Sequence, residues 1–86
     1  MDWEKISLVT RSQRRKEVLR SVEVGPKTPS TIRDQTGRHF SEVSEALNEL
    51  LNAGLVIRLN EDTKGRYYDI TEEGSEIIEY IDSKSE

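Results

Sequence analysis

A pair of closely spaced helix signals in residues 28–56 constrains the fold of this 86-residue chain more than any other feature. Thr28 is a good N-cap, because its hydroxyl can accept from a free backbone N–H of the first turn. Pro29 follows at the first helical position, where its missing N–H costs nothing. Gly37 is a natural left-handed terminator for this helix, and a second helix is expected to start near His39. The stretch therefore predicts two helices joined by a tight turn.

The second helix is amphipathic, because its apolar residues recur at the helical period. They are Phe40, Val43, Leu47, Leu50 and Leu51. The opposite side carries Ser41, Glu42, Glu45, Asn48, Glu49 and Asn52, with Ser44 at the edge. Two helices joined by a turn of about three or four residues make a helix-turn-helix. The second helix is then the candidate reader of a DNA major groove.

A basic helix is predicted upstream of this pair. Ser12 is expected to cap it, and it runs to about Val22 with Val18 and Leu19 in its buried stripe. Its basic residues are Arg14, Arg15, Lys16 and Arg20, with Arg11 just before. Such a run is usually only a solvated face. It could also touch phosphates, since the first helix of such folds can lie near the DNA backbone.

Alternating residues after Gly54 predict a two-stranded hairpin. The residues expected on one side are Leu55, Ile57 and Leu59, and those on the other are Val56, Arg58 and Asn60. A turn-rich segment, 60–65, leads to a second strand over residues 66–70. Lys64 and Arg66 then lie where a hairpin could touch phosphate or the minor groove, or they belong to an ordinary hydrophilic tip.

The two ends of the chain add apolar residues. Residues 1–10 contain Trp3, Ile6, Leu8 and Val9 and are interpreted as an N-terminal arm that packs on the domain or on a partner subunit. Thr71 is expected to cap a last helix, and residues 82–86 form a polar tail that is expected to fray. Its apolar residues are Ile77, Ile78 and Ile81, with Tyr80 on the flank. This terminal apolar surface exceeds what one small core requires, so we predict a homodimer.

Composition limits the function classes. The length predicts a single domain over residues 1–86. The chain has no cysteine and one histidine, which excludes disulfides and thiolate sites and argues against a protein-only zinc site. No apolar run approaches the roughly 20 residues of a membrane span, so we expect a soluble cytoplasmic protein without a membrane partner. No nucleophile–base pair or phosphate-binding glycine loop is visible, so neither an enzyme nor a cofactor is predicted.

Charge is divided unevenly along the chain. The formal net charge is −4, yet residues 1–38 hold nine Lys/Arg against five Asp/Glu, and residues 39–86 hold four against twelve. A negative sum does not indicate a nucleic-acid binder. The polar face of the second helix has three glutamates and no lysine or arginine, and Glu serves in a groove mainly by accepting from cytosine N4. Basic groups appear only at its entrance, at Arg38 and His39, although a histidine here is more often just a turn or capping residue.

In this order, the residues resemble a winged helix-turn-helix transcriptional regulator of the compact type common in archaea. The segments that carry the resemblance are SQRRKEVL, PKTPSTIRDQTG, SEVSEALNELLNAGLV and GRYYDITEEG, and together they cover nearly the whole chain. The resemblance implies an α+β, mainly helical fold with a three-helix core, a two-stranded wing and a C-terminal helix. The predicted core is Val18, Leu19, Val22, Ile32, Val43, Leu47, Leu50, Leu55, Ile57, Tyr68, Ile70 and Ile77.

Two functions follow from this resemblance and from the charges. The first is a regulator that reads double-stranded DNA, often as a dimer, with the helix from about His39 to Ala53 and the wing. Its predicted DNA contacts are Arg38, His39, Ser41, Glu42, Ser44, Glu45, Asn48, Lys64, Arg66, Arg14 and Arg15. Relatives usually carry basic or neutral polar groups where this chain has Glu42 and Glu45. The second function is therefore a winged-helix protein–protein interaction module whose acidic helix contacts a basic partner.

Overall fold

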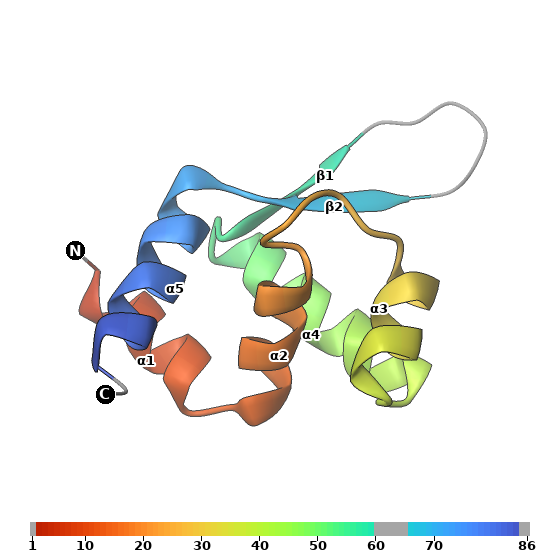
Figure 1. The fold of residues 1–86 in the computed structure, drawn as a ribbon, viewed down its shortest axis with the longest axis horizontal. Coiled ribbons are helices and arrows are strands. Elements are labelled where there is room, and N and C mark those ends of the chain that lie inside the picture. The colour runs from red at the N-terminus through yellow and green to blue at the C-terminus, as the bar shows by residue number, and fades with distance from the viewer. Residues whose placement is uncertain (1, 60–65, 85–86) are drawn as a thin grey trace.

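The computed structural model describes residues 2–59 and 66–84, and these form helices with one antiparallel hairpin (Figure 1). The elements are α1 (Trp3–Thr10), α2 (Gln13–Ser21), α3 (Pro29–Thr36), α4 (Phe40–Asn52), β1 (Val56–Leu59), β2 (Tyr67–Ile70) and α5 (Glu72–Lys84). This order confirms the predicted mainly helical α+β fold, with a helix pair followed by a hairpin and a C-terminal helix.

Helices α2, α3 and α4 begin where local signals predict, and α3 also ends where they predict. The hydroxyls of Ser12 and Thr28 each accept a first-turn backbone N–H at 3.2 Å, which caps α2 and α3. Gly37 ends α3 with a φ of 74°, a left-handed conformation that glycine adopts without strain. At the start of α4 the Glu42 carboxylate accepts from the His39 backbone N–H at 3.2 Å.

The N-terminal segment, predicted as an arm, forms a helix that belongs to the domain. Asp2 caps α1 by accepting from the Glu4 backbone N–H at 3.0 Å. Ile6 and Val9 are buried in the same core as the other helices, and α1 packs against α2 and α5. At the other end α5 continues through Lys84, into the segment that is expected from the sequence to fray.

The core confirms most of the predicted positions and corrects one of them. Ile57 is expected inside, but its side chain is 46% exposed, while Val56 is buried. The reason is that Leu55 precedes the strand, because its N–H donates to the Leu50 carbonyl at the end of α4 at 2.9 Å. The alternation of inward and outward residues therefore begins at Val56 and not at Leu55, which places Ile57 outward. Phe40, expected in the apolar stripe of α4, lies at the edge of that stripe in the first turn and is 47% exposed.

Both strands of the hairpin contact the helices, and the second strand also pairs with the connector between α2 and α3. In the β1–β2 register Arg58 lies opposite Tyr68, whose ring is buried. On the other side of Tyr68, the connector between α2 and α3 forms an isolated bridge through Lys27, with N···O distances of 3.0 and 2.8 Å. Figure 1 shows this connector running beside β2. The bridge fixes the hairpin relative to α3. The predicted turn over residues 60–65, which includes Lys64, lies outside the described residues.

Candidate nucleic-acid interface

The side of α4 that faces away from the core is mainly neutral and polar. Successive residues turn by about 100°, so the exposed side lies opposite the buried Val43, Ala46, Leu47 and Leu50. The outward residues are Ser41, Glu45, Asn48 and Asn52, with Ser44 half-buried beside them. Serine and asparagine both donate and accept hydrogen bonds, as base-edge and phosphate contacts require.

The glutamates of α4 are paired with arginines of α2. Arg15 Nε donates to Glu49 Oε1 at 2.8 Å, and Arg14 Nη2 lies 3.5 Å from the same oxygen. Arg14 Nη1 also lies 3.3 Å from Glu45 Oε1. The hydrogen bond from Arg15 is the largest cause that lowers the pKa of Glu49 below its usual value. The two arginines that the sequence suggested as phosphate contacts are therefore turned toward α4, where they neutralise its acidic flank.

The entrance of α4 is held by a second set of ion pairs. Arg38 Nε donates to Glu17 Oε1 of α2 at 2.8 Å, and Arg38 Nη1 lies 3.9 Å from Glu42. The hydrogen bond from Arg38 lowers the pKa of Glu17, and the same bond raises the pKa of Arg38. Glu42 thus faces Arg38 and the backbone of His39, on the flank of α4 and away from its outward side. His39 itself is exposed at the N-cap.

Several cations in the described part of the chain make no ion pair. They are Arg11, Lys16, Lys27, Arg58, Arg66 and Lys84. Lys27, Tyr68 and Arg58 form one row across neighbouring strands, and directly opposed residues project from the same face. Arg66 is exposed just before β2. Arg58 is not among the DNA contacts predicted from the sequence. Its position on the polar side of the predicted first strand was the feature that could have indicated it.

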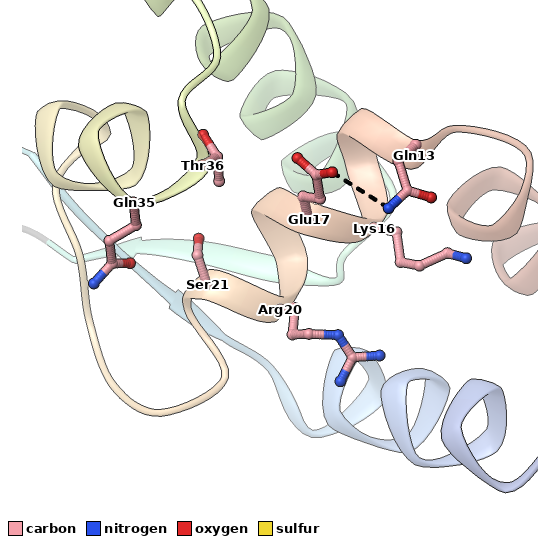
Figure 2. A pocket seen from close by; sticks show the side chains of 7 residues that line it. All are labelled: Gln13, Lys16, Glu17, Arg20, Ser21, Gln35 and Thr36. Atoms are coloured by element: carbon pink, nitrogen blue, oxygen red, sulfur yellow. Dashed lines mark hydrogen bonds between the residues drawn. The ribbon is translucent and has the colours of Figure 1, made fainter. Parts of the chain in front are cut away.

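An open polar groove of about 520 Å³ lies between α2 and α3 (Figure 2). Its lining residues are Gln13, Lys16, Glu17, Arg20, Ser21, Gln35 and Thr36. Most polar groups here already have partners within the protein, such as Glu17 with Gln13 at 3.3 Å and Arg20 with Asp82 at 2.7 Å. The groove therefore presents few free groups to a ligand. Nothing in the sequence indicated it, because only the packing of α2 against α3 creates it.

Two kinds of feature are absent from residues 2–59 and 66–84. No helix there is long and apolar enough to cross a membrane. No group of three or more His, Asp or Glu side chains there could hold a metal ion.

No protein-family model and no curated protein matches the sequence, but several solved structures match the fold. TubR of Bacillus thuringiensis serovar israelensis, bound to 24 bp of tubC, aligns with a TM-score of 0.83 and 16% identity over 95% of this chain and 92% of that one. The homodimeric winged helix-turn-helix DNA-binding domain of Mb0332 from Mycobacterium bovis, a possible ArsR-family regulator, aligns with a TM-score of 0.78 and 23% identity over 93% and 74%. A mutant MarR from E. coli, complexed with operator DNA, aligns with a TM-score of 0.78 and 23% identity over 93% and 59%.

These likenesses show that the chain has the winged helix-turn-helix fold of DNA-binding transcriptional regulators, in which the β1–β2 hairpin is the wing. At such low identities they show the fold alone. The chain spans 59% of the MarR chain and 51% of a matched mutant of Lactococcus lactis ZitR. The three proteins described above come from bacteria, so they do not support the archaeal type that the sequence suggested.

Proposed function

We propose that this chain is a DNA-binding transcriptional regulator that places α4 in a major groove and its wing beside the adjacent backbone. The observation that carries the proposal is the pairing of Glu45 and Glu49 with α2, because it removes the electrostatic objection that the sequence raised. A helix with free glutamates would be repelled by phosphates, whereas here the arginines lie 2.8–3.5 Å away. The DNA-bound structures of TubR and MarR support the same use of the fold.

The proposal sorts the candidate residues into two groups. The base-facing residues are Ser41, Ser44 and Asn48, with His39 and Arg38 at the entrance of α4. Glu45 lies at the edge of this group, beside Arg14. Phosphate contacts come from the unpaired cations near the wing, which are Lys27, Arg58 and Arg66, and from Lys64, which lies outside the described residues. Arg14, Arg15 and Glu42 instead hold α4 in position, because their charged groups already contact neighbours within the protein.

The alternative of a protein–protein module that presents an acidic helix to a basic partner is less favoured. It requires glutamates of α4 that are free to meet lysines or arginines of the partner. Glu49 instead contacts two arginines of its own chain, and Glu42 accepts from the backbone of its own N-cap. A binding function of either kind agrees with the non-enzymatic regulators that share the fold.

The proposed regulator acts as a homodimer through α1 and α5. The isoleucines that first suggested this are no argument, because Ile77, Ile78 and Ile81 are buried in the chain's own core. The remaining support is Trp3, which is 64% exposed and whose ring packs edge-on against Tyr80 at 5.5 Å. The Mb0332 domain is also homodimeric. Light scattering at high micromolar concentration should return a dimer mass that Trp3→Ala reduces, and a monomer mass for the parent would refute this part.

Salt-dependent binding to mixed duplex DNA tests the main proposal. Anisotropy titrations with labelled duplex should give an affinity that falls linearly with salt on logarithmic axes. Arg58→Ala and Arg66→Ala should each reduce the slope by about 0.9 and weaken binding equally on all sequences, because a phosphate contact carries no base information. Lys84→Ala on α5 is the matched control, since it removes the same charge far from α4 and should change nothing. Absence of binding to any duplex at low salt would refute the proposal.

A further inference from the structure

One row of side chains along α4 combines an exposed ring with neutral hydrogen-bonding groups. Phe40, Ser44 and Asn48 are spaced by four residues, so they are neighbours along one side of the helix. Phe40 is 47% exposed, Asn48 is exposed, and Ser44 is half-buried between them. Over eight residues the row spans roughly 12 Å. An aromatic ring that stays half outside the core, in line with the outward polar residues, is available to contact a ligand.

The chemistry of this face suits one kind of base pair. Guanine is read mainly by Arg or Lys, which donate to its O6 and N7. Residues 40–52 contain neither, and Arg38 at the entrance of α4 donates to Glu17 at 2.8 Å. Cytosine is read by a carboxylate that accepts from N4, but Glu45 lies 3.3 Å from the guanidinium of Arg14. Adenine is read by Asn through N6 and N7, and the thymine C5-methyl is contacted by apolar groups such as Phe.

We propose that α4 selects A·T base pairs in the major groove, with Asn48 reading adenine and Phe40 contacting a thymine methyl. This inference rests on the proposed DNA binding and adds the class of base pair that the protein selects. The two contacts fall on different base pairs, because the roughly 12 Å between the residues corresponds to about three or four steps of the duplex. Ser41 and Ser44 bind either kind of pair and add affinity without selecting.

The test begins with selection of bound sequences from a random duplex library by the parent protein. In the selected site, each A·T pair is then replaced by inosine·cytosine, which keeps the minor-groove pattern of A·T and presents the major groove of G·C. Thymine is separately replaced by deoxyuridine, which removes only the methyl, and adenine by 7-deaza-adenine, which removes only N7. We expect inosine·cytosine to weaken binding by about tenfold or more at the pair that Asn48 reads.

Variants assign each contact to its residue. Deoxyuridine should weaken the parent several-fold at one position and leave Phe40→Ala unaffected there, while Phe40→Leu retains part of the effect. The 7-deaza substitution should weaken the parent and leave Asn48→Ala unaffected. Val24→Ala is the matched control, because Val24 is 85% exposed but lies in the connector after α2, so the dependence on thymine should stay as in the parent. Circular dichroism melts verify that the variants fold.

The outcomes separate this inference from the proposal on which it rests. Selected sites dominated by G·C pairs under α4, or sites that tolerate inosine·cytosine, would overturn the inference and leave DNA binding intact. A dependence on the thymine methyl that persists in Phe40→Ala would overturn the assignment of Phe40. Failure of the parent to bind any member of the library at low salt would overturn the proposed function and this inference together.

Discussion

Helices α4 and α5 are alike in length and in the side they bury, and they differ in what surrounds their glutamates. Each has 13 residues. Their buried residues are Val43, Ala46, Leu47 and Leu50 in α4, and Gly74, Ile77, Ile78 and Ile81 in α5. On α4, Glu45 and Glu49 contact arginines of α2. On α5, only Glu73 among the glutamates has an ion-pair partner in the described part of the chain, Lys5 at 2.9 Å.

The net charge that an acidic helix presents to solvent therefore depends on the element packed beside it. The basic helix α2 packs along α4, so the charges cancel where α4 meets its neighbour. Helices α1 and α2 both pack against α5, and each offers it one cation: Lys5 pairs with Glu73, and Arg20 pairs with Asp82. In the described part of the C-terminal half, the exposed glutamates without an ion pair therefore lie on α5, at Glu72, Glu76 and Glu79.

The largest effect should come from truncating the buried side of either helix. Leu47→Ala and Ile78→Ala should each destabilise the domain by about 2–5 kcal/mol, because both side chains are fully enclosed and leave a cavity. Urea denaturation measures the change, and Asn48→Ala and Glu79→Ala are exposed controls on the same helices, expected within about 0.5 kcal/mol of the parent. A Leu47→Ala domain that melts within about a degree or two of the parent would show that the core is assigned wrongly.

Because Gly74 of α5 is closely packed, adding a methyl group there should destabilise the domain. Gly74→Ala places a Cβ 2.3 Å from the Leu55 carbonyl oxygen and 2.9 Å from Ile70 Cγ1, whereas α4 accommodates Ala46 at its own contact. Such overpacking costs about 1–3 kcal/mol, since backbone has to move. Ser75→Ala is the neighbouring control in the same denaturation assay. Equal stability of Gly74→Ala and the parent would mean that α5 does not approach Leu55 so closely.

Reversing the charge of one glutamate should change DNA affinity when the residue is on α4 but not when it is on α5. Glu45→Lys adds a cation to the outward side of α4 and releases Arg14, so it should tighten binding to random duplex and steepen the salt slope by roughly one unit. Glu76→Lys makes the same change in net charge on α5 and should have little effect. Anisotropy at several salt concentrations gives both numbers. Equal responses would show that net charge alone, and not the position of α4, governs binding.

The smallest effect concerns the acid stability of the α2–α4 ion pairs. The pKa of Glu49 is lowered in the folded protein, chiefly by the hydrogen bond from Arg15, so the folded state binds fewer protons than the unfolded state. The stabilisation is present above the usual carboxyl pKa of about 4.3 and is lost as the pH falls through the lowered value. Its size is at most about 1 kcal/mol, because the Glu49 side chain is 37% exposed and solvent screens the pair.

Glu49→Gln should therefore destabilise the domain slightly at neutral pH and reduce the loss of stability between about pH 5 and pH 3. Urea midpoints measured across that range give the comparison. Glu76→Gln on α5 is the control for removing an exposed carboxylate that has no ion pair. If Glu49→Gln and the parent lose stability in parallel on acidification, then the pair with Arg15 contributes nothing.

The order of the elements from α2 onward, and most of their ends, follows from the sequence alone. Capping residues such as Ser12 and Thr28 bond to a backbone N–H three residues later. The start of a helix can therefore be predicted from neighbouring residues without knowledge of the fold. The helical period also placed Leu47 inside and Asn48 outside, as the structure does. Whether Asn48 contacts DNA stays a prediction, because the sequence shows that a side chain is polar and outward but not what it meets.

Which charges cancel and which apolar residues stay exposed depends on contacts that form only in the folded chain. Arg15 and Glu49 are 34 residues apart, so no local pattern relates them, and the acidic helix of the sequence becomes a nearly neutral surface once α2 lies beside it. Ile57 is exposed because Leu55 is held by the end of α4 before the strand begins. Contacts between distant segments set these outcomes, since the free energy of a charge or an apolar side chain depends on its neighbours in space.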